Sequence, residues 1–233
     1  PDTVLAKEAG LELGIKESIV VNDRMETSVP DIYAAGDAVQ VKHYVTGNDA
    51  LISLAGPANK QGRIIADNIC GGDSRYLGSQ GSSVIKVFDM TAATTGINET
   101  NAKKSGLEVD TVILSPMSHA GYYPGGKVMT MKVVFEKESY RLLGAQIIGY
   151  EGVDKRIDML ATAIHAGLNA TQLKDLDLAY APPYSSAKDP VNMAGFMIDN
   201  IAKGTLKQWH LEDMDKISKD KDVVLIDVRT VCE

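Results

Sequence analysis

The order of the apolar stretches between residues 80 and 203 restricts the possible folds most. Stretches with strand character come first, at 82–96, 109–116, 127–139 and 141–152. A helical pattern follows at 153–168, with apolar residues at helical spacing: Ile157, Leu160, Ala161, Ile164 and Leu168. Strands grouped ahead of helices are typical of an antiparallel sheet that helices cover on one face. The sequence therefore predicts an α+β domain over residues 80–203.

In residues 1–75 short helical and strand-like stretches alternate, which predicts the final part of an α/β domain. We expect a short helix over 3–13, short strands at 19–21 and 32–34, and a helix that begins near Pro57. Gly71 and Gly72 end this last helix. An irregular stretch before it, at 43–56, is longer than a simple turn, and long ordered loops are often functional.

The C-terminal part, residues 204–233, is predicted to be a linker that runs into a further domain. Residues 204–222 are polar and rich in charge, and VVLIDVR at 223–229 has the composition of a buried parallel strand. The chain starts at Pro1 and stops just after this apolar run. We therefore expect it to be a piece of a longer protein.

Composition excludes several classes of protein. The formal net charge of −7 argues against nucleic acid as the main partner, because phosphate contacts need clustered Lys and Arg. No apolar run approaches the roughly 18 to 20 residues of a membrane-spanning helix, and no signal peptide opens the chain. Cys70 and Cys232 are too few for a disulfide framework, which favours the cytoplasm. The histidines show no metal-binding spacing, so we predict no metal site and expect Cys70 to be a small buried residue.

The stretch TSVPDIYAAGDAV, residues 27–39, is the first candidate site. An α/β sheet binds ligands at the carboxyl ends of its strands, where small residues such as Ala35 and Gly36 let a cofactor approach the backbone. The carboxylate of Asp37 could accept hydrogen bonds from the hydroxyl groups of such a ligand. The alternative is that Asp37 only caps a turn.

Two loops rich in tyrosine and proline form the second candidate site. AYAPPYSSAKDPVNMAGF at 179–196 contains Pro182 and Pro183, which stiffen the backbone and exclude regular structure. Tyr180 is therefore displayed from a rigid loop, and Tyr122 lies in SHAGYYPGGK at 118–127. Their phenolic O–H groups could serve a reactive site, although such loops are also common as packing and turn features.

ETSVPDIYAAGDAV resembles the second flavin-binding motif of the FAD- and NAD(P)H-dependent disulfide reductases. The resemblance implies that Asp37 holds the ribityl chain of FAD and that the helix near Pro57 points at the flavin's pyrimidine oxygen. It also places the other residues of the motif beside the cofactor: Thr27, Ile32, Tyr33, Ala34, Ala35 and Gly36.

The segments YYPG, EGVDKRID and YAPPYSSAKDPVN, in this order, resemble the dimerisation domain of the coenzyme A disulfide reductases. In that family two tyrosines reach across the homodimer into the partner's active site, and they match Tyr122 and Tyr180. Tyr180 would then also lie beside the flavin. Lys188 and Asn59 match contacts to coenzyme A, although some members have His in place of Asn59, and Lys188 could instead be a solvated surface lysine.

VVLIDVRTVCE resembles the opening of a rhodanese domain, in which Cys232 is not at the position of the nucleophile. No G-x-G-x-x-G fingerprint occurs, and no cysteine matches the family's single redox-active cysteine. The resemblance implies an FAD-dependent, NAD(P)H-driven enzyme that reduces coenzyme A disulfide or persulfide. An NADH oxidase that reduces oxygen, or a dimerisation module without catalysis of its own, are the alternatives. The sequence does not decide between NADH and NADPH.

Overall fold

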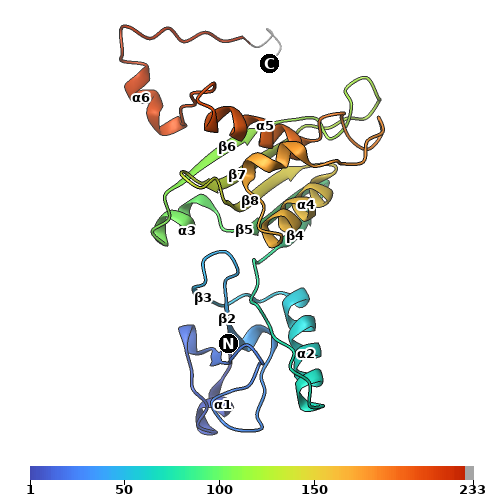
Figure 1. Cartoon of the computed structure of the whole chain (residues 1–233), viewed down its shortest axis with the longest axis vertical. Helices are drawn as coiled ribbons and strands as arrows, with labels where there is room; N and C mark the ends of the chain where they lie inside the picture. Colours follow the sequence, from blue (N-terminus) through green and yellow to red (C-terminus); the bar gives the residue numbers. More distant parts are fainter. Residues whose placement is uncertain (229–233) are drawn as a thin grey trace.

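The structure is a computed structural model and describes residues 1–228. Its elements form two groups stacked along the long axis of the molecule (Figure 1), each with its own sheet and its own hydrophobic core. We call the group with the three-stranded sheet the small module and the group with the five-stranded sheet the large module. The predicted domain boundaries near residues 75–80 and 203–204 stay a prediction.

The small module is a three-stranded sheet with one long helix beside it. Its order along the chain is α1 (Val4–Glu8), η1 (Ile15–Glu17), β1 (Ile19–Val20), η2 (Gly36–Ala38), β2 (Val39–Lys42), β3 (Asp49–Ala50) and α2 (Ala55–Ile69). Strand β1 runs parallel to β2, and β2 runs antiparallel to β3. A core of Met25, Val39 and Val41 packs against Ile64 and Ile65 of α2.

The predicted strand at residues 32–34 is wrong. Only Tyr33 forms an isolated bridge, to Glu26, and Ile32 is exposed rather than buried. Asp31, just before this segment, has a φ of 63°, which breaks extended structure. The regular strand β2 begins instead two residues after Asp37.

Two further expectations for the small module need correction. The helix predicted over 3–13 ends at Glu8, because Gly10 adopts a φ of 78° and turns the chain. Cys70, expected to be buried, is an exposed free thiol at the end of α2. Apolar residues precede Cys70 in the sequence, but Ile69 beside it is also exposed, so this side of the helix end faces water.

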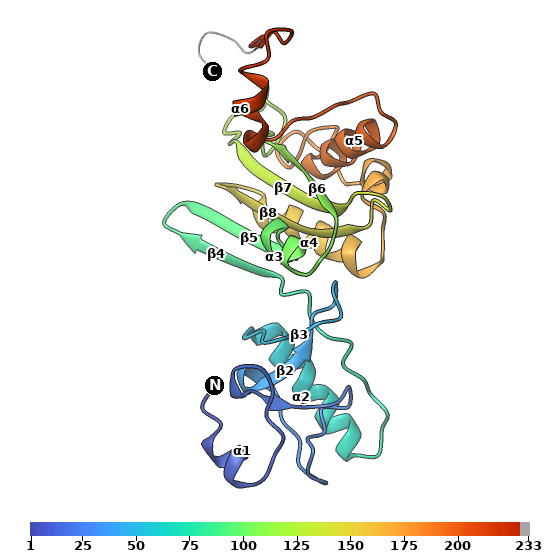
Figure 2. The same ribbon diagram turned by 90° about the vertical axis from the view of Figure 1, so that its left-hand side faces the viewer.

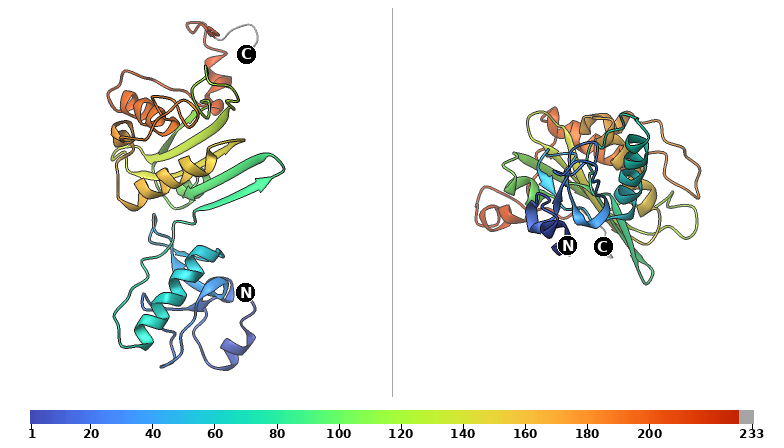
Figure 3. Two further views of the ribbon diagram at one scale, coloured as in Figure 1. Left: turned by 90° about the vertical axis from the view of Figure 1, so that its right-hand side faces the viewer. Right: turned by 90° about the horizontal axis from the view of Figure 1, so that it is seen from below.

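The large module confirms the prediction of an antiparallel sheet covered on one face. Its order along the chain is β4 (Ser83–Val87), β5 (Met90–Gly96), α3 (Glu99–Lys104), β6 (Val109–Leu114), β7 (Met129–Glu136), β8 (Leu142–Gly149), α4 (Val153–His165), η3 (Ala170–Asp175), α5 (Pro190–Ala202), η4 (Leu211–Asp213) and α6 (Met214–Ile217). The strands are ordered β4-β5-β8-β7-β6, and every pair is antiparallel. Helices α4 and α5 lie on the same face of the sheet (Figures 2 and 3).

The core of the large module lies between this sheet and its helices. Val133 and Leu143 from the sheet, Leu160 from α4 and Ile198 from α5 are fully buried in one cluster. The sequence did not predict α5, because the proline-rich motif that precedes it dominated the interpretation of residues 179–196. Its start carries the expected signals nevertheless, since Asp189 caps the helix and Pro190 occupies the first turn.

The loop between β2 and β3 connects the two modules. The side chain of Val45 is buried in the core of the large module, and Arg141 donates a hydrogen bond to its carbonyl oxygen at 3.2 Å. The ring of Tyr44 stacks on His165 with 5.2 Å between centroids, and its hydroxyl donates to the carbonyl oxygen of His165 at 3.0 Å. These contacts join the modules beyond the covalent linker.

The predicted buried strand at 223–229 is wrong over its described part, residues 223–228. Val224 and Ile226 are 78% and 76% exposed, and the segment lies outside both sheets. A strand needs a neighbour that pairs its backbone N–H and C=O groups, so apolar composition alone does not form one. Arg229 and Cys232, which belong to the rhodanese resemblance, lie outside the described residues.

Acidic pH is expected to lower the free energy of unfolding of the large module, because Glu99 forms ion pairs with two lysines. Lys103 lies 2.5 Å from its carboxylate and Lys132 is also paired with it, and these hydrogen bonds lower the pKa of Glu99 to about 2. A lowered folded-state pKa contributes stability above the unfolded-state value of 4.5 and loses it as the pH falls toward 2. Glu99→Gln should remove about 1 kcal/mol of this pH-dependent stability, as urea unfolding at pH 5 and pH 2.5 can measure. The exposed Glu138→Gln is the control, and equal pH dependence in Glu99→Gln and the unmutated protein would contradict the prediction.

Candidate active site

The residues of the first motif gather around the turn that leads into β2. Thr27 N–H donates to the carbonyl oxygen of Ile32 at 2.9 Å, and Ala34 N–H donates to that of Met25 at 3.2 Å. These two hydrogen bonds fold the segment back on itself. Asp37 follows in η2, and its side chain is exposed. The carboxylate is therefore exposed just before the amino end of β2, the central strand of the three-stranded sheet.

Gly36 joins this turn to α2. Its N–H donates to the buried side-chain oxygen of Gln61 at 2.7 Å, and its φ of 80° lies in the left-handed region that favours glycine. Ala55 begins α2, and Pro57 lies in its first turn as predicted. Within residues 1–228, no side chain caps this helix start. Its first N–H groups form a partial positive pole beside the Asp37 turn.

Tyr122 and Tyr180, 58 residues apart in sequence, form a hydrogen-bonded pair with 2.7 Å between their hydroxyl oxygens. Tyr122 is 76% exposed and Tyr180 is 45% exposed. The hydrogen bond with Tyr122, with partial removal from water as a smaller cause, raises the pKa of Tyr180. The pair therefore presents two phenolic hydroxyl groups toward solvent at one edge of the large module.

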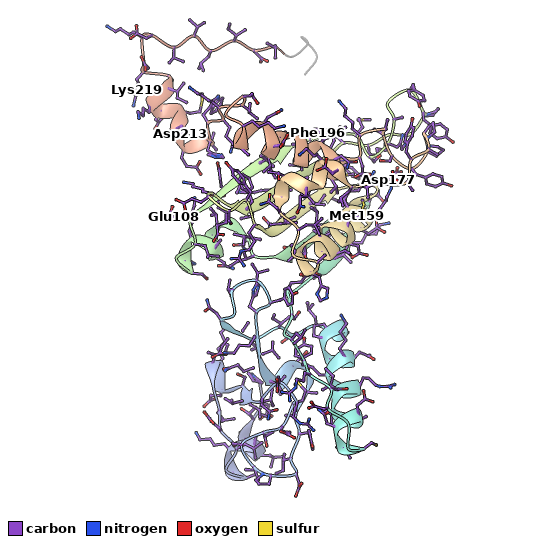
Figure 4. All side chains as sticks on the ribbon, viewed as in Figure 1. Glu108, Met159, Asp177, Phe196, Asp213 and Lys219 are labelled. Carbon is purple, nitrogen blue, oxygen red and sulfur yellow. The ribbon has the colours of Figure 1, made fainter. Side chains whose placement is uncertain are left out.

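The two tyrosine-bearing loops lie side by side at the end of the large module (Figure 1). Ala120 N–H donates to the carbonyl oxygen of Ser185 at 2.9 Å, which ties one loop to the other. A cavity of about 600 Å³ opens beneath them, lined in part by His119, Lys155 and Tyr180. Figure 4 shows Asp177, at the base of the second loop, at the opposite end of the sheet from Glu108.

The two predicted coenzyme A contacts are both exposed but lie in different modules. Lys188 follows the tyrosine loop, and its ammonium group lies 5.6 Å from the centre of the Phe196 ring. Asn59 is on α2, near the Asp37 turn. Within one chain, the predicted residues thus form two groups: the flavin-side group in the small module and the tyrosine group in the large one.

Sequence reasoning missed the residues that support the tyrosine loops. Arg156 and Asp189 are buried and form an ion pair at 2.9 Å beneath the loops. Arg156 follows Val153 and precedes Ile157 on the apolar stripe of α4, so a charged residue on that stripe was the available signal. Within residues 1–228 no group of His, Cys, Asp or Glu is arranged to hold a metal ion. The same residues contain no helix long and apolar enough to cross a membrane.

Both modules match models of one protein family. Residues 1–62 match the model described as pyridine nucleotide-disulphide oxidoreductase, and residues 82–190 match the model of its dimerisation domain. The chain belongs to the pyridine nucleotide-disulphide oxidoreductase family.

Several relatives carry names that narrow this class. The chain is 39% identical over 191 residues to the NAD(P)H sulfur oxidoreductase (CoA-dependent) of Pyrococcus furiosus, covering 82% of this chain and 43% of the relative. It is 35% identical over 197 residues to a coenzyme A disulfide reductase of Staphylococcus aureus, covering 84% of this chain and 44% of the relative. The crystal structure of reduced Bacillus anthracis CoADR-RHD is similar with a TM-score of 0.91 and 50% identity, covering 94% of this chain and 40% of that one.

The chain spans less than half the length of each of these relatives. Their names therefore describe proteins longer than this chain, and they do not by themselves assign an activity to it.

Proposed function

We propose that this chain is part of a homodimeric, FAD-dependent oxidoreductase that uses NAD(P)H to reduce coenzyme A disulfide or coenzyme A persulfide. The observation that carries the proposal is the exposed Tyr122–Tyr180 pair on two adjoining loops. The names of the similar proteins from Pyrococcus and Staphylococcus support the same substrate class. The redox-active cysteine of this reaction would come from a segment outside residues 1–233.

The residues around Asp37 fit a flavin. The exposed carboxylate could accept hydrogen bonds from the ribityl hydroxyls, and Gly36 lets the ligand approach because it has no side chain. The uncapped N–H groups at the start of α2 would face negative charge on the flavin ring. Bound FAD would carry electrons from NAD(P)H to the thiol, and the part of these residues would be to hold it between the Asp37 turn and the start of α2.

The tyrosine pair would act in the partner subunit's site. A cysteine thiolate that attacks a disulfide releases a coenzyme A thiolate, which needs a proton. Tyr180 and Tyr122 are exposed to solvent, so their hydroxyl groups could reach across the dimer and donate that proton, and the raised pKa of Tyr180 keeps its hydroxyl protonated. Tyr180 would also lie against the flavin of the partner.

Lys188 and Asn59 would contact coenzyme A. The ammonium group of Lys188 is exposed and suits an anionic nucleotide, and Asn59 would offer its amide from the flavin-side helix. We also propose that residues 204–233 lead into a rhodanese domain, which would tie the reductase to persulfide sulfur. The Bacillus anthracis CoADR-RHD, which matches this chain at 50% identity, supports this arrangement.

An assay of the intact enzyme tests the proposed reaction. With coenzyme A disulfide under anaerobic conditions, oxidation of NAD(P)H should release free thiol in proportion to the reductant consumed. If no thiol is released under these conditions and the enzyme oxidises NAD(P)H only when air is admitted, with consumption of oxygen, the proposal fails and the NADH oxidase alternative replaces it.

Asp37→Ala in the intact enzyme is expected to weaken FAD binding by about 10-fold or more, because hydrogen bonds to a charged acceptor contribute about 1.5–3 kcal/mol. The flavin absorbance that remains after gel filtration measures the loss. Asp31→Asn removes a carboxylate from the same segment and tolerates the positive φ found there, so it is the matched control. Full flavin occupancy in Asp37→Ala would contradict the assigned role.

A further inference from the structure

The guanidinium of Arg156 is buried directly beneath the two tyrosine loops. Arg156 is 1% exposed and heads the largest fully buried side chains of the described residues. It sits in the first turn of α4, on the stripe that faces the core. A charge so deeply buried needs several partners, because water cannot solvate it.

Those partners come from both tyrosine loops. Nη2 lies 2.9 Å from the carbonyl oxygen of Ser118, in the first loop. It also lies 3.3 Å from the carbonyl oxygen of Tyr184 and 3.2 Å from the hydroxyl of Ser185, both in the second loop. One nitrogen thus joins the backbones that display Tyr122 and Tyr180.

Asp189 holds the guanidinium in this position from the other side. Its carboxylate lies 3.2 Å from Nε and 2.9 Å from Nη2, and it accepts a hydrogen bond from the Ser185 hydroxyl at 2.6 Å. The same carboxylate caps α5 through the N–H of Val191 at 3.0 Å. The orientation of Arg156 is therefore set by the rigid start of a helix.

Gly152 makes room for this arrangement. A Cβ added at Gly152 would lie 2.1 Å from Nη1 of Arg156, so any larger residue would collide with the guanidinium. The carbonyl oxygen of Gly152 also accepts a hydrogen bond from Nη1 at 3.2 Å. The φ of 68° there also favours glycine. The segment EGVDKRID thus supplies both the guanidinium and the space that it occupies.

We propose that Arg156 is a positioning residue that holds the loop carrying Tyr122 against the loop carrying Tyr180 and so presents the two tyrosines as a pair. This inference rests on the proposed function, because the pair is what that function uses. Lysine in its place would keep the charge opposite Asp189 but has no planar fork with which to reach acceptors on both loops.

The test compares the intact enzyme with its Arg156→Lys variant. Turnover of coenzyme A disulfide should fall about 10- to 100-fold through kcat, with KM and FAD content little changed, because small displacements of positioned groups have effects of this size. In the Tyr122→Phe/Tyr180→Phe background the same substitution should add no further loss, since the pair is already absent. The NMR resonance of a fluorine label on the Tyr180 ring should shift in Arg156→Lys, and a shift is also expected in Tyr122→Phe, which removes the hydrogen-bond partner of Tyr180.

The outcomes separate this inference from the proposed function. If the phenylalanine variants keep full turnover, the proposed function fails. If they lose turnover while Arg156→Lys keeps both the turnover and the fluorine resonance of the unmutated enzyme, the positioning role is overturned. Should Arg156→Lys fail to fold, Asp189→Asn decides: the amide keeps the size of the carboxylate but removes the charge that orients the guanidinium, so an unshifted fluorine resonance in it would likewise overturn the role.

Discussion

Replacing Tyr122 and Tyr180 together by phenylalanine in the intact enzyme is expected to lower kcat for coenzyme A disulfide about 100-fold, the usual effect of removing a positioned proton donor. The phenylalanine rings keep the aromatic packing and lose only the hydroxyls, which lie 2.7 Å apart. Because hydrogen bonding raises the pKa of Tyr180, its proton stays in place at neutral and mildly alkaline pH. The unmutated enzyme should therefore keep its proton-donor function across that range.

Steady-state thiol release measures this effect, and FAD absorbance with gel filtration confirms that cofactor and dimer persist. Tyr123→Phe is the matched control, since this tyrosine lies in the same loop but packs edge-on against His119 with 5.5 Å between ring centroids. It should change kcat less than about 2-fold, in line with small effects outside a proton-donor site. Equal turnover in the double phenylalanine variant and the unmutated enzyme would remove the tyrosines from the mechanism.

Asp189→Ala is expected to lower the free energy of unfolding by about 3–5 kcal/mol, because it leaves the Arg156 guanidinium buried without its counter-ion. Burial alone would raise the pKa of Asp189, but hydrogen bonds from Ser185, Arg156 and the Val191 N–H outweigh burial and lower it. The substitution also removes the cap of α5. Equilibrium unfolding in urea measures the loss.

Asp175→Ala provides the comparison for this second prediction. The side chain of Asp175 is 67% exposed and pairs with Lys174 at 3.6 Å, so its removal should change the free energy of unfolding by less than about 1 kcal/mol. If both substitutions destabilise the protein equally, burial of the Arg156–Asp189 pair is not what gives Asp189 its importance.

Regular elements of the large module were predictable because their signals are local. Asn98 caps α3, and Gly106, with a φ of 77°, follows its end; both residue types are common signals of a helix boundary. The apolar stripe of α4 predicted that Ile157 and Leu160 are buried, which the structure confirms. Local signals failed at residues 32–34 and 223–228, because a strand forms only where another strand can pair with it.

The candidate site divides in the same way. The motifs singled out Asp37, Tyr122 and Tyr180 one by one, since each lies among glycine and proline residues that restrict the backbone. They could not show that the two hydroxyls meet, because 58 residues separate the tyrosines. The role of Arg156 could not be predicted from the sequence. The helical pattern predicts which face of α4 is buried, but it does not show which hydrogen-bond acceptors lie near that face.

The sequence by itself determined the family resemblance, the α+β order of elements and the residues that carry reactive or hydrogen-bonding groups. Only the tertiary structure decided which of these groups form hydrogen bonds with one another. Gly36 bonds to Gln61, Tyr122 bonds to Tyr180, and Arg156 bonds to acceptors on both loops. The physical reason is one of range. Backbone preference and apolar spacing act over a few residues, whereas a buried guanidinium finds its partners only after distant segments have packed around it.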